Sequence, residues 1–224
     1  WLSATTTLLI TVIPVNDAPT ISTTQTLITT NEDTPKTITV AVNDIDNAYN
    51  SLVVTATSSN QSLFTNNSIT QSGATGATTS FVLTPVTDAN GTAHITVTVS
   101  DGQYAVTTVL TVTVLPVNDA PTVSTTQAAI ATLENTSRLM TVSVSDIDNL
   151  YSGLTITATS NNQTLLPNTN ITQSGATSAT TSFILTPVTD ASGTAHITVT
   201  VSDGQYSATT ALTLTVTPIN FPPI

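Results

Sequence analysis

Cysteine is absent from this sequence, and basic residues are almost absent: Lys36 and Arg138 stand against thirteen acidic residues. The missing thiols exclude disulfides, cysteine nucleophiles and thiolate metal sites. The formal net charge of -11 makes nucleic acid and anionic membrane surfaces poor partners, because binding phosphate groups requires lysine and arginine. A soluble cation is the partner that this charge favours.

Aromatic residues and long apolar runs are also scarce. Aromatic side chains make up 4% of the chain, which argues against a stacking platform for sugars. The longest apolar runs, such as residues 8–10, are far too short to span a bilayer, and the sequence shows no signal-peptide pattern. We therefore expect no direct membrane insertion, and we expect any export signal or anchor to lie outside these residues.

Threonine, valine and isoleucine are abundant, whereas strong helix formers are few. Because β-branched residues suit a pleated, half-buried surface, this composition predicts an all-β fold. The segment His94–Ser100 supports that prediction, since its apolar residues alternate with polar ones.

An internal repeat organises the chain. The motif Pro-Val-Asn-Asp-Ala-Pro-Thr at residues 14–20 returns 102 residues later at 116–122, and residues 91–104 return unchanged at 193–206. A unit of about 100 residues has the size of an immunoglobulin-like sandwich. We predict two full repeats at 15–116 and 117–218, the last strand of a preceding repeat at 1–14, and the start of another linker at 219–224.

Turn residues divide the first full repeat into seven predicted strands, consistent with a Greek-key β-sandwich. The expected strands cover residues 20–29, 36–42, 52–58, 68–73, 79–86, 93–100 and 106–115.

Every acidic residue falls in a predicted loop or at a strand end. Tracing the alternating strand directions places Glu32 and Asp88 at the C-terminal end of the first sandwich. It places the upper loops of the second sandwich, with the linker, at the other side of the same junction. The junction set is Glu32, Asp88, Asn118, Asp119, Asp146, Asp148 and Asp203; the repeat adds the equivalent residues Asn16, Asp17, Asp44, Asp46, Asp101 and Glu134.

Six carboxylates at one junction repel one another. Each pair at about 4 Å costs about 1 kcal/mol in water and about 4 kcal/mol at a surface-like dielectric. Ca²⁺ fits these residues best, because it takes six to eight hard oxygen ligands from carboxylates, amides and carbonyls. Zinc would require His or Cys ligands, and His94 and His196 are predicted to point outward elsewhere. Turn formation alone is the other explanation for such Asp and Asn residues.

Together, the Val-Asn-Asp-Ala-Pro linker, Glu32 and Glu134, the two Asp-x-Asp pairs and the Ser-Asp-Gly turns resemble bacterial cadherin-like repeats of giant surface adhesins. That resemblance implies calcium ligation between domains, with ligand roles for Glu32, Asn118, Asp119, Asp146 and Asp148. Two departures leave the number of ions per junction open: the linker motif carries one Asp, and the cadherin Asp-Arg-Glu motif is absent.

No catalytic arrangement is predicted, because the sequence contains no recognisable nucleophile motif. The expected function is that of an extracellular, cell-surface spacer in a secreted bacterial adhesin, with calcium and neighbouring repeats as partners and an undefined adhesive target. Two alternatives are an adhesive carbohydrate- or protein-binding module, and an accessory region of a secreted enzyme.

Overall fold

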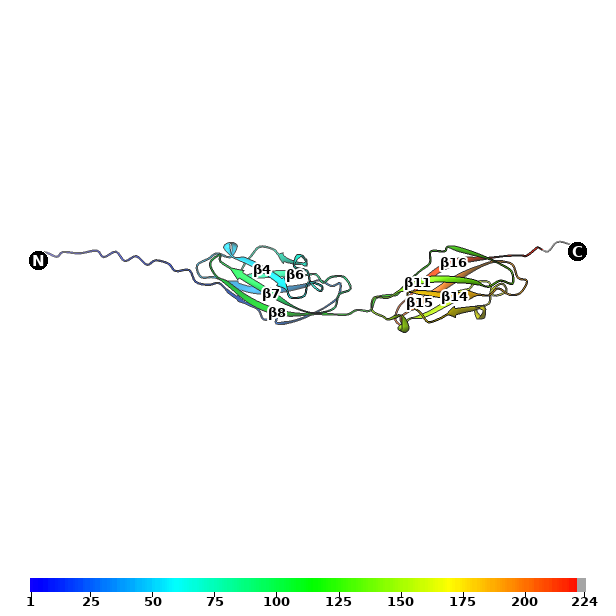
Figure 1. The fold of residues 1–224 in the computed structure, drawn as a ribbon. Helices are drawn as coiled ribbons and strands as arrows, with labels where there is room; N and C mark the ends of the chain where they lie inside the picture. The colour runs from blue at the N-terminus through cyan, green and yellow to red at the C-terminus, as the bar shows by residue number, and fades with distance from the viewer. Residues whose placement is uncertain (221–224) are drawn as a thin grey trace. The chain divides into compact units, whose positions relative to one another are not determined.

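A computed structural model describes residues 1–220 of the chain. The chain divides into two compact units, one ending at Val117 and the other beginning at Asn118. Each unit is described by itself below (Figure 1). Within the described residues, no helix has the length and apolar character needed to cross a membrane.

The first unit is a sandwich of two four-stranded sheets, and the predicted all-β immunoglobulin-like fold is confirmed. One sheet has the strand order β1-β3-β6-β5 and the other has the order β2-β8-β7-β4. The strands are β1 (Thr20–Ser22), β2 (Leu27–Asn31), β3 (Lys36–Asn43), β4 (Val53–Ser58), β5 (Ile69–Ser72), β6 (Thr78–Leu83), β7 (Gly91–Ser100) and β8 (Ala105–Leu115).

The prediction of a single first strand over residues 20–29 is wrong. Two strands, β1 and β2, occupy this region and belong to different sheets: β1 pairs with β3, whereas β2 runs parallel to β8. Thr23 marks the break, because its hydroxyl donates to the Thr39 carbonyl at 3.1 Å and accepts the Gln25 N–H at 3.1 Å. These bonds replace a regular ladder, so each repeat has eight strands rather than seven.

The second unit repeats this arrangement, with sheets β13-β14-β11-β9 and β10-β16-β15-β12. Its strands are β9 (Thr122–Ser124), β10 (Ala129–Leu133), β11 (Arg138–Ser145), β12 (Thr155–Ser160), β13 (Ile171–Ser174), β14 (Thr180–Leu185), β15 (Gly193–Ser202) and β16 (Ser207–Thr217). Four short 3₁₀ turns complete the two units: Tyr49–Ser51, Asn66–Ser68, Tyr151–Gly153 and Asn168–Asn170.

Each sandwich buries its own apolar core. In β8 the alternation places Leu110, Val112 and Val114 inside at 0–1% exposure, while the residues between them face outward. Burial of each such side chain contributes about 1.5–3 kcal/mol. Leu63 and Phe64 enter the same core from the connection after β4, and both are buried. Because the two cores share no residue, each unit has its own source of stability.

Residues 1–19 contain no strand, and most of them are exposed. The assignment of residues 1–14 as a final strand therefore stays a prediction. Of the predicted linker at 219–224, residues 221–224 lie outside the described part of the chain.

Candidate metal centre

The turn after β3 brings the first Asp-x-Asp pair to one end of the first unit. Asp44 Oδ1 accepts the backbone N–H groups of Asp46 and Asn47, both at 2.8 Å, which fixes the turn. The other carboxylate oxygen, Asp44 Oδ2, is buried and has no hydrogen-bond partner. An unpaired buried carboxylate oxygen is costly, so Asp44 Oδ2 is a candidate ligand for a cation.

Asp101 stands at the same end, in the turn between β7 and β8. Its Oδ1 accepts the N–H groups of Gln103 at 2.7 Å and Tyr104 at 2.6 Å, and its Oδ2 accepts the side chain of Asn16 at 2.8 Å. The Tyr104 N–H and then the Asn16 amide lower the pKa of the Asp101 carboxyl, because these donors stabilise its charged form. Asp101 therefore presents a carboxylate, not a carboxylic acid, at neutral pH.

The preceding linker is tied to both turns. The Asp17 N–H donates to Asp46 Oδ2 at 2.8 Å, and the Asn47 side chain donates to Asn16 Oδ1 at 3.1 Å. The structure thus brings together the predicted site residues of this end: Asn16, Asp17, Asp44, Asp46 and Asp101. Both polar atoms of the Asn16 side chain form hydrogen bonds, and through one of them Asn16 positions Asp101. To bind a metal, the Asn16 side-chain oxygen would have to give up its hydrogen bond to Asn47.

Asn47 is a residue that the site prediction missed. It bridges Asn16 and the turn of Asp44, with its amide 3.4 Å from Asp44 Oδ1. Its position directly after Asp-x-Asp, repeated as Asn149, is the sequence signal that could have identified it.

The second unit has the same hydrogen bonds at its corresponding end. Asp146 Oδ1 accepts the N–H groups of Asp148 and Asn149, and Asp146 Oδ2 is again buried without a hydrogen-bond partner. Asp148 Oδ2 accepts the Asp119 N–H at 2.7 Å. The side chain of Asn118 first, and then the Tyr206 N–H, lower the pKa of Asp203. The corresponding predicted residues Asn118, Asp119, Asp146, Asp148 and Asp203 are therefore also assembled.

At the C-terminal end of the first unit, Glu32 differs from a simple loop acid because it is buried. Its Oε1 accepts the N–H of Val117, and its Oε2 lies 3.5 Å from the Asn90 amide. In the second unit, Glu134 Oε1 accepts the N–H of Ile219 at 2.9 Å. Each glutamate thus holds the backbone just after the last strand of its sandwich.

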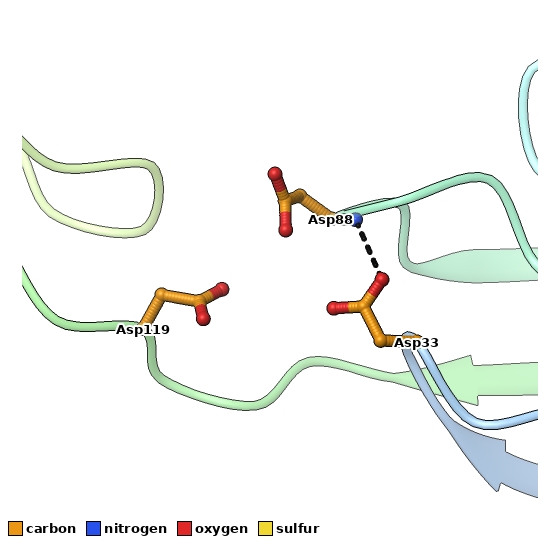
Figure 2. A group of neighbouring side chains, drawn as sticks. All are labelled: Asp33, Asp88 and Asp119. Carbon is orange, nitrogen blue, oxygen red and sulfur yellow. Dashed lines mark hydrogen bonds between the residues drawn. The ribbon is translucent and has the colours of Figure 1, made fainter.

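Two loops also meet at this end, through Asp33 and Asp88 (Figure 2). Both have a left-handed backbone with φ of 56°, a conformation that Asp and Asn tolerate better than most residues. The Asp88 N–H donates to Asp33 Oδ1 at 3.3 Å. Figure 2 also draws Asp119, which follows Val117 by two residues along the chain.

In the second unit, Asn135 replaces the equivalent of Asp33. Asn135 both accepts the Asp190 N–H and donates its amide to Asp190 Oδ1, each at 3.0 Å. An Asn–Asp pair satisfies itself, whereas the Asp33–Asp88 pair places two like charges together without a donor between the carboxylates. The first repeat therefore has more unbalanced charge at this end.

This natural difference predicts the effect of Asp33→Asn. With a chelator present, we expect the variant to stabilise the first repeat by about 1 kcal/mol, because it supplies one hydrogen bond and removes one repulsive charge. Urea unfolding measures the change, and Asn135→Asp should show the opposite sign in the second repeat. A stability loss in Asp33→Asn would contradict this account.

The donor set at these ends consists of carboxylate and amide oxygens, which suits a hard cation. His94 is exposed on the outer face of β7, with Nδ1 3.2 Å from Thr111 Oγ1, as the alternation predicts. It lies in the strand and not in the acidic turns, so its nitrogen does not contribute to this set.

Several solved structures are similar to this chain at low sequence identity. Titin domains Z1Z2 in complex with telethonin are 15% identical, with a TM-score of 0.40, covering 92% of this chain and 100% of that one. An endo-fucoidan hydrolase of glycoside hydrolase family 107 is 17% identical, with a TM-score of 0.38 over 90% of this chain; the match spans 29% of the hydrolase chain. A search of curated protein sequences gives no significant match. Residues 16–114 and 118–217 each match the model of a bacterial Ig domain, and the chain therefore belongs to the bacterial Ig domain family as two tandem repeats.

Proposed function

We propose that this chain is a spacer segment of a bacterial cell-surface adhesin, and that calcium bound at the ends of its repeats stiffens it. The observation that carries this proposal is the buried carboxylate oxygen without a hydrogen-bond partner, which recurs as Asp44 Oδ2 and Asp146 Oδ2. A divalent cation would supply the missing partner and would balance the surrounding carboxylates.

The charge distribution within each repeat supports a cation at this end. Lys36 and Arg138 stand at the first residues of β3 and β11, whereas Asp44 and Asp146 directly follow the last residues of those strands. An eight-residue strand spans about 23 Å. That distance exceeds the screening length of about 8 Å at physiological salt, so neither basic residue neutralises the acidic turn at the far end of its strand.

The connection between the repeats is anchored by hydrogen bonds on both sides. Val117 is bound through its N–H to Glu32 of the first unit, while Asn118 and Asp119 are bound to Asp203 and Asp148 of the second. One peptide bond therefore joins a residue held by one sandwich to a residue held by the next. A cation that draws in Asp119 together with Asp146 or Asp148 would strengthen the second anchor.

The chain distance between the two anchors adds to this argument. Asp119 lies two residues beyond Val117, so their Cα atoms stay within about 7 Å. A cation bound at the start of the second repeat would therefore restrain the connection close to the last residue of the first repeat. A spacer that holds a distant binding domain away from the cell requires such a restrained connection.

Calcium titration of chelator-treated protein, followed by calorimetry, tests the proposal. We expect dissociation constants of about 0.1–1 mM, typical of extracellular calcium modules, and weaker binding of magnesium. Asp44→Asn and Asp146→Asn should each remove binding in their own repeat. Both variants keep the oxygen that accepts the turn N–H groups, so the turn itself is preserved.

Small-angle scattering with calcium and with a chelator tests the stiffening separately. We expect a narrower distribution of molecular dimensions with calcium. Binding without a change in dimensions would retain the metal site but remove the spacer mechanism, whereas the absence of binding heat at millimolar calcium would overturn the metal proposal.

A further inference from the structure

The strands β7 and β15 have identical sequences, so neither can select its own neighbour. Residues 91–104 return unchanged at 193–206, and β7 pairs with β8 as β15 pairs with β16. Similar domains in tandem are prone to exchange strands while they fold. A feature outside β7 and β15 must therefore distinguish β8 from β16.

The buried side chains of the two last strands differ at a single position. β8 has Val112 there and β16 has Leu214, and both are 0% exposed. They lie in register opposite Ala93 and Ala195. Leucine carries one more methylene than valine, and a closely packed core responds to a change of that size. The packing around this position therefore decides which of the two strands fits.

A second difference between the repeats lies at the same level of the core. In the first repeat, the Asn60 amide is 3.5 Å from the Thr92 carbonyl oxygen, and the Phe64 N–H donates to the Asn60 carbonyl at 2.9 Å. Thr92 directly precedes Ala93, the residue opposite Val112. Phe64 therefore enters the core beside Val112, within the same cluster of buried residues.

In the second repeat, Leu166 takes this place through the same bonds. Its N–H donates to the Asn162 carbonyl at 2.8 Å, and the Asn162 amide donates to the Thr194 carbonyl at 3.0 Å, next to Ala195. The first core thus combines a large residue from the connection with a small one from the strand, whereas the second combines two leucines. Phe64 and Leu166 are each 0% exposed, so neither core has free space here.

We propose that this size-matched pair makes each last strand specific for its own repeat. If β16 entered the first sandwich, Leu214 would lie beside Phe64 and overfill the core. If β8 entered the second sandwich, Val112 beside Leu166 would leave a cavity. Each exchange destabilises the sandwich that accepts the foreign strand, so the correctly paired chain is favoured although β7 and β15 are the same.

A double-mutant cycle in the first repeat tests the pair, with hydrogen exchange in urea and a chelator reporting the unfolding of each repeat. Phe64→Leu and Val112→Leu should each raise the unfolding equilibrium constant about 10-fold, through a cavity and through overpacking respectively. The double variant should lie closer to the parent protein than either single variant, because two leucines fill this space in the second repeat.

Val114→Leu is the matched control, because the equivalent residue in β16 is also valine, Val216. Phe64→Leu should not relieve the destabilisation that Val114→Leu causes. Additive effects of Phe64→Leu and Val112→Leu would show that the two side chains do not share a space, and would overturn the proposed pair.

Cysteine trapping tests the choice of strand, because the chain has no cysteine of its own. Leu27 pairs with Thr111 of β8, and Thr213 is the equivalent residue of β16. Leu27→Cys with Thr213→Cys should therefore form a disulfide when β16 has taken the place of β8, since paired strands lie within disulfide reach. Leu27→Cys with Thr111→Cys is the positive control for the native pairing.

The trapped fraction is measured after dilute refolding from urea with a chelator, and oxidation of the same variants without unfolding gives the background. We expect this fraction to be at least about 10-fold higher when Phe64→Leu and Val112→Leu are also present, because the two cores then match at this level. A trapped fraction that these two substitutions leave unchanged would overturn the proposed strand specificity, even where the cycle shows coupling.

Discussion

Phe64→Ala is expected to lower the free energy of unfolding of the first repeat by about 3–5 kcal/mol, the usual loss for a buried phenylalanine. Phe64 is fully buried, and its N–H donates to the Asn60 carbonyl at 2.9 Å, so the side chain is held in the core from a fixed connection. The strands around it are paired in ladders and cannot collapse freely into the space that alanine leaves. A cavity and lost burial together give the large effect.

Hydrogen exchange resolved by repeat measures this change, because the two cores have no residue in common. Core amides of the second repeat should keep their protection. Phe64→Leu is the matched control, since the second repeat has fully buried Leu166 at the equivalent position, and its loss should be clearly smaller. Equal destabilisation of both repeats by Phe64→Ala would show that they unfold as one unit.

Calcium at about 100 times its dissociation constant is expected to add about 2.7 kcal/mol to the stability of each repeat that binds one ion. For a domain of about 100 residues, this corresponds to a rise in Tm on the order of 10–20 °C. The stabilisation arises because the folded turn presents its carboxylates together, including the buried oxygens of Asp44 and Asp146, whereas the unfolded chain separates them.

Calorimetric melting with calcium, with magnesium and with a chelator measures the effect. Asp44→Asn should remove the calcium-dependent rise of the first repeat, and Asp146→Asn that of the second. In chelator, both variants should be at least as stable as the parent protein, because each removes one negative charge from a group of neighbouring carboxylates. A calcium-dependent rise that persists in the double variant would place the ion elsewhere, and identical melting curves in all three conditions would reject structural calcium.

Much of the fold could be predicted from local patterns. Alternation in β7 and β8 indicates which side chains are buried, since successive residues of a strand face opposite sides. The 102-residue shift gives the two repeats, and strand alternation places Asp44 and Asp101 at one end and Asp88 at the other. The contacts of Asn16 with Asp101 and of Asp33 with Asp88 agree with that placement.

Other features depend on partners that are distant in the sequence. The division into β1 and β2 arises because β1 pairs with β3 and β2 pairs with β8. Both partners lie outside residues 20–29, so the local sequence does not predict the division. Glu32 accepts a hydrogen bond from Val117, 85 positions away, and Asn47 donates one to Asn16, a linker residue 31 positions away.

Composition and periodicity therefore determined that this chain forms two acidic β-sandwiches with their charge gathered at the ends, because burial of alternating residues is a local property of a strand. Tertiary structure alone decided which carboxylate oxygens are paired and which are not. Asp44 and Asp46 look equivalent in the sequence, yet one oxygen of Asp44 is buried without a partner while Asp46 accepts the Asp17 N–H. That difference arises only when the turn, the linker and the neighbouring loop are brought together in the folded unit.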